Sequence, residues 1–214
     1  MPAHSSSQVT DDMQALTLDA YLQRHGFHLI PPHSEKNEGF ITEGQKRQFT
    51  EVLATYSPIT SVLEIGLNAG HSADHILKTC PQIQKFVSID INIHPYSTLA
   101  IEYFSKKYAG AFQFIQGDSH VIVPDYATHF PKQKFDLIYI DGSHTYEGSF
   151  GDIQNCEKLA HPDTILWIDD YHLLGSGQAI LGAQIEGLIE VIAYHESSDL
   201  FGPRYWAEAR YCSK

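Results

Sequence analysis

Residues 61–73 read SVLEIGLNAGHSA, an apolar run that ends in a loop with two glycines. The run has the length and the branched apolar side chains of a buried strand. Gly66 and Gly70 let the backbone turn tightly and approach a ligand, and the helical pattern that starts near His71 would point its amide groups into the same place. The alternative is a plain strand-to-helix turn, and the glycine spacing alone does not decide between the two.

Four more short apolar runs follow, with helical patterns between them. Nearly continuous apolar strands that alternate with amphipathic helices indicate a parallel sheet covered on both faces. The last two strands, Gly187–His195 and Arg204–Cys212, are separated only by the turn-rich residues SSDLFGP and are expected to pair antiparallel at one edge. The predicted fold class is therefore α/β, a doubly wound, Rossmann-like, seven-stranded sheet that is mostly parallel with an antiparallel C-terminal strand pair. The predicted parallel strands are Ser61–Ile65, Phe86–Ile91, Phe112–Ile115, Phe135–Ile140 and Ile165–Ile168.

The chain before the first strand is less regular. Residues 1–41 are expected to form an N-terminal tail, a helix and a segment that could serve as a lid. The tail is predicted to be disordered at residues 1–10, the helix covers Asp11–His25, and the irregular segment Gly26–Ile41 follows. Residues 42–214 are expected to form one domain.

Composition excludes several classes of partner. Lys and Arg number 14 against 26 Asp and Glu, which gives a formal net charge of −12. Binding to a phosphate backbone needs a basic face, and the largest Lys/Arg clusters are the pairs Lys46-Arg47 and Lys106-Lys107. The three widely spaced cysteines form neither a zinc spacing nor a disulfide framework. We expect a cytoplasmic protein that binds neither nucleic acid nor membrane; its N-terminal helix and edge strands offer surfaces for a homodimer.

Polar residues stand where the predicted strands end, and this is where parallel sheets bind ligands. Asp90, at the end of the second strand, is suited to hydrogen-bond the two hydroxyls of a ribose, and Asp118 with Ser119 after the third strand would suit an adenine edge. Each residue alone would be interpreted as part of a turn. Together with the glycine loop they favour a ligand that contains adenosine.

Two residues decide between the adenosine-containing ligands. Asn68 stands where a dinucleotide fingerprint has its second glycine, and Glu64 puts an acid where a pyrophosphate would be repelled. A sulfonium-bearing amino acid would be tolerated there, so S-adenosylmethionine fits better than NAD. An NAD-dependent oxidoreductase on a related fold, or a non-catalytic module that binds S-adenosylmethionine, remain the alternatives.

Three carboxylates are expected at one rim of the sheet, because Asp141 ends the fourth strand and Asp169 with Asp170 ends the fifth. Acids clustered without a cation repel each other and shift their pKa values upward, so a divalent ion is their natural partner. Oxygen ligands favour Mg²⁺. The alternative makes Asp141 and Asp170 turn residues and Asp169 a solvated acid.

Four motifs resemble the metal-dependent O-methyltransferases, a group of class I S-adenosylmethionine-dependent methyltransferases that includes the catechol and the macrolide-sugar O-methyltransferases. The motifs are VLEIGLNAGHSA, FIQGDSH, IYIDGSHTYEG and WIDDYH, they occur in the order of the family, and the resemblance covers Thr42 to Lys214. It implies transfer of the methyl group of S-adenosylmethionine to a hydroxyl of a small molecule, assisted by Mg²⁺ at a vicinal diol, sugar or catechol. In two departures from the catechol-type pattern, Asp170 replaces Asn, and His161-Pro-Asp replaces a Pro-Gly-Gly turn.

The resemblance also implies roles for single residues. The matching acids hold the metal, which makes Asp141, Asp169 and Asp170 its ligands. His144 is the implied general base, since an imidazole can accept the proton of a metal-held hydroxyl near neutral pH. Catechol-type enzymes carry Lys at this position and macrolide-sugar enzymes carry His, which favours a sugar or another polyol. The competing candidate bases are His71 and His172.

The residues expected to bind the cofactor come from two sources: the ends of the predicted strands and the positions that the resemblance implies. Gly66 and Ser72 would hold the methionine end, Asp90 the ribose, and Ile91 with Ser119 the adenine. The residues expected to bind the cofactor are Glu64, Gly66, Asn68, Gly70, Ser72, Asp90, Ile91, Asp118, Ser119 and Asp141. The aromatic residues that could line an acceptor pocket, or could equally be core, are Tyr146, Phe150 and Tyr171.

Overall fold

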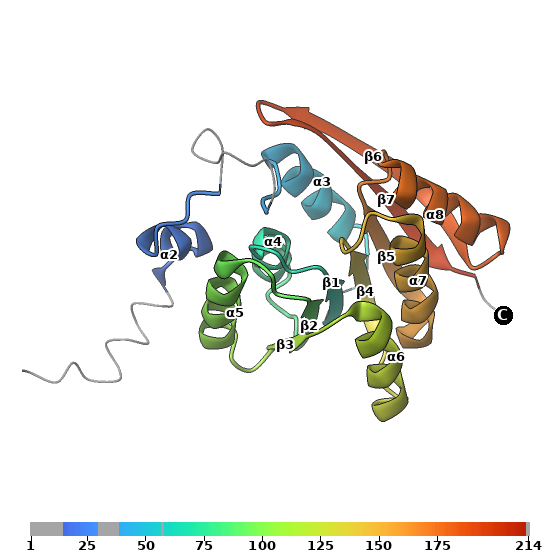
Figure 1. Cartoon of the computed structure of the whole chain (residues 1–214), viewed down its shortest axis with the longest axis horizontal. Coiled ribbons are helices and arrows are strands. Elements are labelled where there is room, and N and C mark those ends of the chain that lie inside the picture. Colours follow the sequence, from blue (N-terminus) through green and yellow to red (C-terminus); the bar gives the residue numbers. More distant parts are fainter. Residues whose placement is uncertain (1–14, 30–38, 57, 213–214) are drawn as a thin grey trace, which may run out of the picture.

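A seven-stranded sheet runs through the molecule with helices on both of its faces (Figure 1). The computed structural model describes residues 15–29, 39–56 and 58–212. The strand order is β3-β2-β1-β4-β5-β7-β6; β1 to β5 are parallel, and β7 pairs antiparallel with both β5 and β6. The predicted fold class is confirmed. The strands are β1 (Ser61–Ile65), β2 (Lys85–Asp90), β3 (Phe112–Gln116), β4 (Phe135–Ile140), β5 (Ala160–Asp169), β6 (Ile189–Asp199) and β7 (Gly202–Tyr211).

Helices α2 to α5 lie on one face of the sheet and α6 to α8 on the other (Figure 1). Each face buries its own apolar core, as a parallel sheet covered on both sides requires. No helix in the described part of the chain combines the length and the apolar character that crossing a bilayer demands. The helices are α2 (Leu18–Arg24), α3 (Glu43–Leu53), α4 (His71–Thr79), α5 (Pro95–Lys107), α6 (Ser119–His129), α7 (Tyr146–Cys156) and α8 (Leu174–Ile185), with a 3₁₀ turn η1 (Glu157–Leu159) after α7.

Several element boundaries differ from the prediction; strand β5, for example, begins at Ala160 and not at Ile165. Helix α2 begins at Leu18 because the hydroxyl of Thr17 accepts a hydrogen bond from the N–H of Ala20 and caps it, so a continuous helix over Asp11–His25 is wrong at residues 16 and 17. The segment predicted as a turn between β6 and β7 is mostly strand, since only residues 200 and 201 separate them. The predicted tail at residues 1–10 and most of the possible lid lie outside the described residues.

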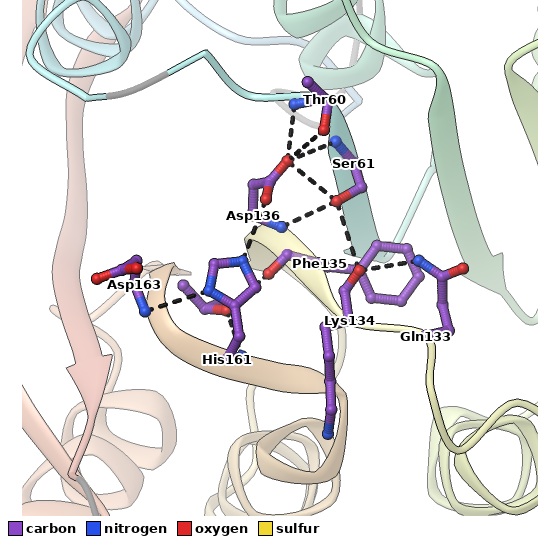
Figure 2. A network of polar contacts seen from close by, with 9 residues as sticks. Thr60, Ser61, Gln133, Lys134, Phe135, Asp136, His161 and Asp163 are labelled. Carbon is purple, nitrogen blue, oxygen red and sulfur yellow. Dashed lines mark hydrogen bonds and ion pairs between the residues drawn. The ribbon is translucent and has the colours of Figure 1, made fainter.

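Asp136 ties the amino ends of β1, β4 and β5 together (Figure 2). Its Oδ2 accepts hydrogen bonds from the backbone N–H and the hydroxyl of Thr60 and of Ser61, at 2.8 to 3.1 Å. Its Oδ1 accepts one from Nε2 of His161 at 3.1 Å, and Nδ1 of the same ring accepts from the N–H of Asp163. Burial raises the pKa of Asp136, but these donors outweigh it and lower the pKa below its ordinary value. The segment His161-Pro-Asp, expected as a turn, is the start of β5, and His161 serves the fold there.

A hollow of about 860 Å³ also lies at this amino edge and is lined in part by Asp136 and His161. Both ring nitrogens of His161 are already engaged within the protein. The size of this hollow therefore does not mark it as the site of chemistry, which parallel sheets place at the opposite edge.

Candidate active site

The register of the strands places four of the predicted site residues side by side at the carboxyl edge of the sheet. Ile65 in β1 pairs with Ile89 in β2 and with Ile140 in β4, and Ile140 pairs with Ile168 in β5. The chain order reverses between β1 and β4, which is where doubly wound sheets bind their ligands. The residues that emerge next, at the carboxyl edge, are Gly66, Asp90, Asp141 and Asp169.

A cavity of about 480 Å³ opens at this edge, within the usual range for small-molecule sites. Three carboxylates belong to its wall, and none of its described lining residues is Lys or Arg. Seven of the ten residues expected to bind a cofactor line it: Gly66, Asn68, Asp90, Ile91, Asp118, Ser119 and Asp141. The lining residues to which the sequence analysis gave no role include Ile93, His94, Gly142 and Ser143, which directly follow the exits of β2 and β4.

Glu64 lies beneath the glycine loop and has no exposed surface. The hydroxyl of Ser72 donates to its Oε1 at 2.6 Å and that of Ser88 to its Oε2 at 2.7 Å. Burial raises the pKa of Glu64 to about 8 against these two hydrogen bonds, and the charges of Asp141 and Asp90 add to the rise. Glu64 and Ser72 are thus bonded to each other below the loop, and neither lines the cavity.

Packing within the chain requires both glycines of the loop. Gly66 has φ 94°, and a Cβ there would collide with the carbonyl oxygen of Asp141. Gly70 has φ 81°, and a Cβ there would collide with the ring of Phe104 in α5. Each position therefore excludes a side chain whether or not a ligand is bound.

Asp90 holds the loop in place. Its Oδ2 accepts hydrogen bonds from the N–H groups of Leu67 and Asn68 at 2.8 and 2.9 Å, and its Oδ1 accepts one from the N–H of Asn92 at 2.5 Å. A carboxylate offers about four acceptor positions. With the loop in this position, one of them is left for a hydroxyl of a ligand, where two ribose hydroxyls were expected.

Asp141, His144 and Asp170 gather beyond the ends of β4 and β5, each with a potential ligand atom within 4.8 Å of the others. Nε2 of His144 lies 3.7 Å from Oδ1 of Asp141 and 3.3 Å from Oδ2 of Asp170. The contact with Asp141 raises the pKa of His144, burial opposes the rise, and Asp170 adds to it. Burial raises the pKa of Asp141, which His144 counteracts. The two carboxylates and the imidazole form a set that could hold a cation or move a proton.

Asp169 adjoins this cluster, but its oxygens already accept bonds from protein donors. The hydroxyl of Tyr139 donates to Oδ2 at 2.5 Å, Nε2 of Gln45 donates to the same oxygen at 3.1 Å, and the N–H of Asp170 donates to Oδ1 at 2.9 Å. Burial raises the pKa of Asp169 to about 8, and the charges of Asp141 and Asp170 add to this. The structure therefore brings two of the three predicted metal ligands together and keeps Asp169 behind them.

The competing histidines differ in position. Both ring nitrogens of His71 are engaged, Nδ1 with the carbonyl of Gly39 and Nε2 with Oδ1 of Asp19 at 2.7 Å. Nδ1 of His172 lies 3.7 Å from Oδ1 of Asp170. His172 therefore borders the acid cluster, while His71 ties helix α4 to the N-terminal part of the chain.

The predicted pocket aromatics lie among α7, α8 and the last strands, and none of them lines the 480 Å³ cavity. Tyr146 stacks on Phe150 at 5.5 Å between ring centroids, beside Gly182 of α8. Tyr171 packs its ring against Tyr194 at 4.9 Å.

Residues 63–171, just over half of the chain, match a family model described as a methyltransferase domain. The chain belongs to this methyltransferase family. The match spans the glycine loop, the cavity wall and the acid cluster. No curated protein matches this methyltransferase by sequence.

Solved structures share the fold of this methyltransferase across nearly the whole chain. An O-methyltransferase from Bacillus cereus in complex with SAH is 14% identical with a TM-score of 0.69, covering 95% of this chain and 96% of that one. The O-methyltransferase TomG from Streptomyces achromogenes, involved in tomaymycin synthesis and in complex with SAM, is 12% identical with a TM-score of 0.69, covering 99% of this chain and 92% of that one. At such identities the likeness is one of fold, and it agrees with the expected class I methyltransferase architecture.

Proposed function

We propose that this methyltransferase moves the methyl group of S-adenosylmethionine to a hydroxyl of a small molecule, at a vicinal diol, sugar or catechol. The observation that carries the proposal is the position of Asp141, which belongs both to the cavity wall and to the cluster with His144 and Asp170. Molecules bound at these two places would meet at this side chain, as transfer between two reactants requires. The SAH and SAM complexes of the two O-methyltransferases of similar fold support the same donor.

The charge of the cavity supports S-adenosylmethionine over NAD. Asp90, Asp118 and Asp141 line the wall. These carboxylates would repel a pyrophosphate and attract the sulfonium and ammonium groups of S-adenosylmethionine. When bound, S-adenosylmethionine supplies a methyl group on a positively charged sulfur.

The acid cluster fits a divalent cation. Asp141 and Asp170 offer carboxylate oxygens, and their mutual repulsion contributes to the raised pKa of Asp141 after burial itself. We assign these two side chains to the cation, with Asp169 joining them if it releases Tyr139 and Gln45. A bound Mg²⁺ would act as a Lewis acid that makes a nearby hydroxyl easier to deprotonate.

His144 is best placed to take the proton of the acceptor hydroxyl. Its Nε2 lies 3.3 Å from Oδ2 of Asp170 and 3.7 Å from Oδ1 of Asp141, so the imidazole borders the proposed cation site and could take a proton from a hydroxyl held there. His172 contacts one acid and packs its ring against Tyr205, so we rank it second.

The first test measures ligand binding by thermal shift, since a ligand that binds only the folded state raises its apparent stability. SAH, S-adenosylmethionine and NAD are each compared with Mg²⁺ and with EDTA. We expect both S-adenosyl ligands to stabilise the protein and Mg²⁺ to add a further shift. Stabilisation by NAD alone would rule out the proposed donor.

The second test follows a labelled methyl group from S-adenosylmethionine into a panel of polyols and catechols. We expect Asp141→Asn and Asp170→Asn to lose metal-dependent transfer, while Asp125→Asn, at an acid on α6 outside the cavity and the cluster, keeps it. SAH binding without transfer to any hydroxyl would point to a non-catalytic binding module.

A further inference from the structure

A half-buried arginine, Arg204, lies near the start of β7. Trp206 pairs with Asp169 at the end of β5, so Arg204 lies two residues beyond that pair. Here the β6–β7 hairpin extends past the carboxyl edge of the parallel strands (Figure 1). The register therefore places Arg204 at the carboxyl edge of the sheet, next to the end of β5 that leads into Asp170.

An aromatic ring holds the guanidinium in position. The Cζ atom of Arg204 lies 5.0 Å from the ring centroid of Phe40, which is buried and packs edge-on against Phe201 at 6.0 Å. A cation over an aromatic face is attracted by the ring, but that contact leaves the N–H donors of the guanidinium available. The position of Arg204 is thus set before any ligand arrives.

No described carboxylate forms an ion pair with Arg204, although the chain carries 26 acids against 14 Lys and Arg. Arg210 on the same strand shows the usual arrangement, with NH2 2.8 Å from Oε2 of Glu190. A half-buried guanidinium with unused donors in an acidic protein is well suited to bind an anion from outside.

We propose that Arg204 binds a carboxylate of the methyl acceptor, so that the acceptor is an acidic polyol or catechol such as a sugar acid or a dihydroxybenzoate. This rests on the proposed function, which places the acceptor hydroxyls at the Asp141–Asp170 cluster. A carboxylate matches the planar fork of one guanidinium in a bidentate pair. A phosphate dianion beside these acids would need more positive charge than one arginine supplies.

The test compares pairs of compounds that differ only in the carboxylate: a dihydroxybenzoate and its amide, a uronic acid and its parent hexose, and glycerate and glycerol. Binding is measured by calorimetry with SAH and Mg²⁺ present, so that no reaction occurs. The carboxylate member of at least one pair is expected to bind ten or more times more tightly than its neutral partner. The ratio should fall to near one in Arg204→Gln, be partly restored in Arg204→Lys, and stay unchanged in the control Arg210→Gln.

The melting temperature and SAH affinity of each variant report whether it folds, and Arg204→Lys keeps the charge if the glutamine variant does not fold. The inference is overturned if no pair shows a preference for the carboxylate, or if Arg204→Gln keeps the wild-type preference. Labelled methyl transfer on the same pairs separates the two proposals. Transfer without a carboxylate preference supports the methyltransferase activity and rules out the role of Arg204. An Arg204-dependent preference without transfer shows that Arg204 binds a carboxylate but rules out these compounds as methyl acceptors.

Discussion

Asp90 has two uses in the proposed site that compete for the same oxygens. Its place at the end of the second strand could be predicted from the sequence, and it does line the cavity. The sequence could not predict that Asp90 also accepts hydrogen bonds from three backbone N–H groups. These bonds depend on the shape of the loop, where Asn68 has φ 49°. Patterns along a chain locate a residue on an element but do not show which neighbours will occupy its side chain.

Replacing Asp90 tests whether the loop and the ligand depend on this carboxylate. In Asp90→Asn one oxygen becomes an NH₂ group, which cannot accept the N–H bonds that fix the loop. We expect the affinity for SAH, measured by calorimetry, to fall at least about tenfold, equivalent to about 1.4 kcal/mol. Asp125→Asn removes the same charge from α6 outside the cavity and should bind SAH as the wild type does. Unchanged affinity in Asp90→Asn would contradict the assignment.

Glu64 should make the stability of the protein depend on pH. Its pKa is about 8 in the folded protein against an ordinary value of 4.5, so the folded state binds the proton more tightly than the unfolded state. The stability from this group is complete below pH 4.5 and is lost as the pH rises towards 8, by up to about 1.4 kcal/mol per pH unit.

The corresponding measurement is urea unfolding of the wild type and of Glu64→Gln at several pH values within this window. The uncharged amide lacks the titration, while the other groups titrate alike in both proteins. The stability of the glutamine variant relative to the wild type should therefore increase with pH. A constant difference between the two curves would show that burial does not raise the pKa of Glu64 as described.

At the scale of elements, the parallel strands were the most predictable part of the fold. Strands buried on both faces read as continuous apolar runs, so their positions follow from composition alone. The β6–β7 hairpin is different, because polar residues such as Ser197 and Ser198 continue a strand that lies at the edge of the sheet.

The sequence predicted which acids lie near the ends of β4 and β5, but it did not predict which of them point towards each other. Asp169 and Asp170 are adjacent, but the positive φ of Asp170 (54°) turns its side chain towards His144 while Asp169 faces Tyr139.

The polar tie at the amino ends of β1, β4 and β5 should contribute to stability without affecting ligand binding. Asp136→Ala would leave the N–H groups of Thr60 and Ser61 without their carboxylate partner. We expect the free energy of unfolding to fall by about 2–3 kcal/mol, as for unsatisfied backbone donors that are partly buried. Denaturant unfolding measures the loss, and calorimetry should find the SAH affinity within about twofold of the wild type, an energy change well below 1.4 kcal/mol.

Asp163→Ala is the matched control, because this exposed side chain lies at the start of β5 near His161, and its backbone N–H, which the substitution keeps, makes the contact with the ring of His161. An equal loss of stability in both variants would show that Asp136 does not tie the strands. A large loss of SAH affinity in Asp136→Ala would show that the two edges of the sheet are coupled.

At the scale of the whole molecule, the two edges of the sheet have separate tasks. The amino edge holds strands together through Asp136, and the carboxyl edge carries the cavity and the acid cluster. The net charge of −12 surrounds both with a negative potential, which favours cationic ligands over anionic ones. This bias follows from composition, and the places of the three cavity acids follow from the apolar runs that they end, so both could be stated before the fold was known.

The negative potential predicts a difference between two ligands of almost the same shape. S-adenosylmethionine carries one more positive charge than SAH, so its affinity includes an additional attraction that salt should weaken. The Debye length shrinks from about 30 Å at about 0.01 M salt to about 3 Å at about 1 M. We expect the ratio of the S-adenosylmethionine affinity to the SAH affinity, measured by calorimetry across this range, to fall by about threefold or more. Adenosine has no charge and serves as the control, since its affinity should change little. If salt weakens S-adenosylmethionine and SAH equally, the sulfonium does not sense the acids of the cavity wall, and their part in selecting the donor would have to be abandoned.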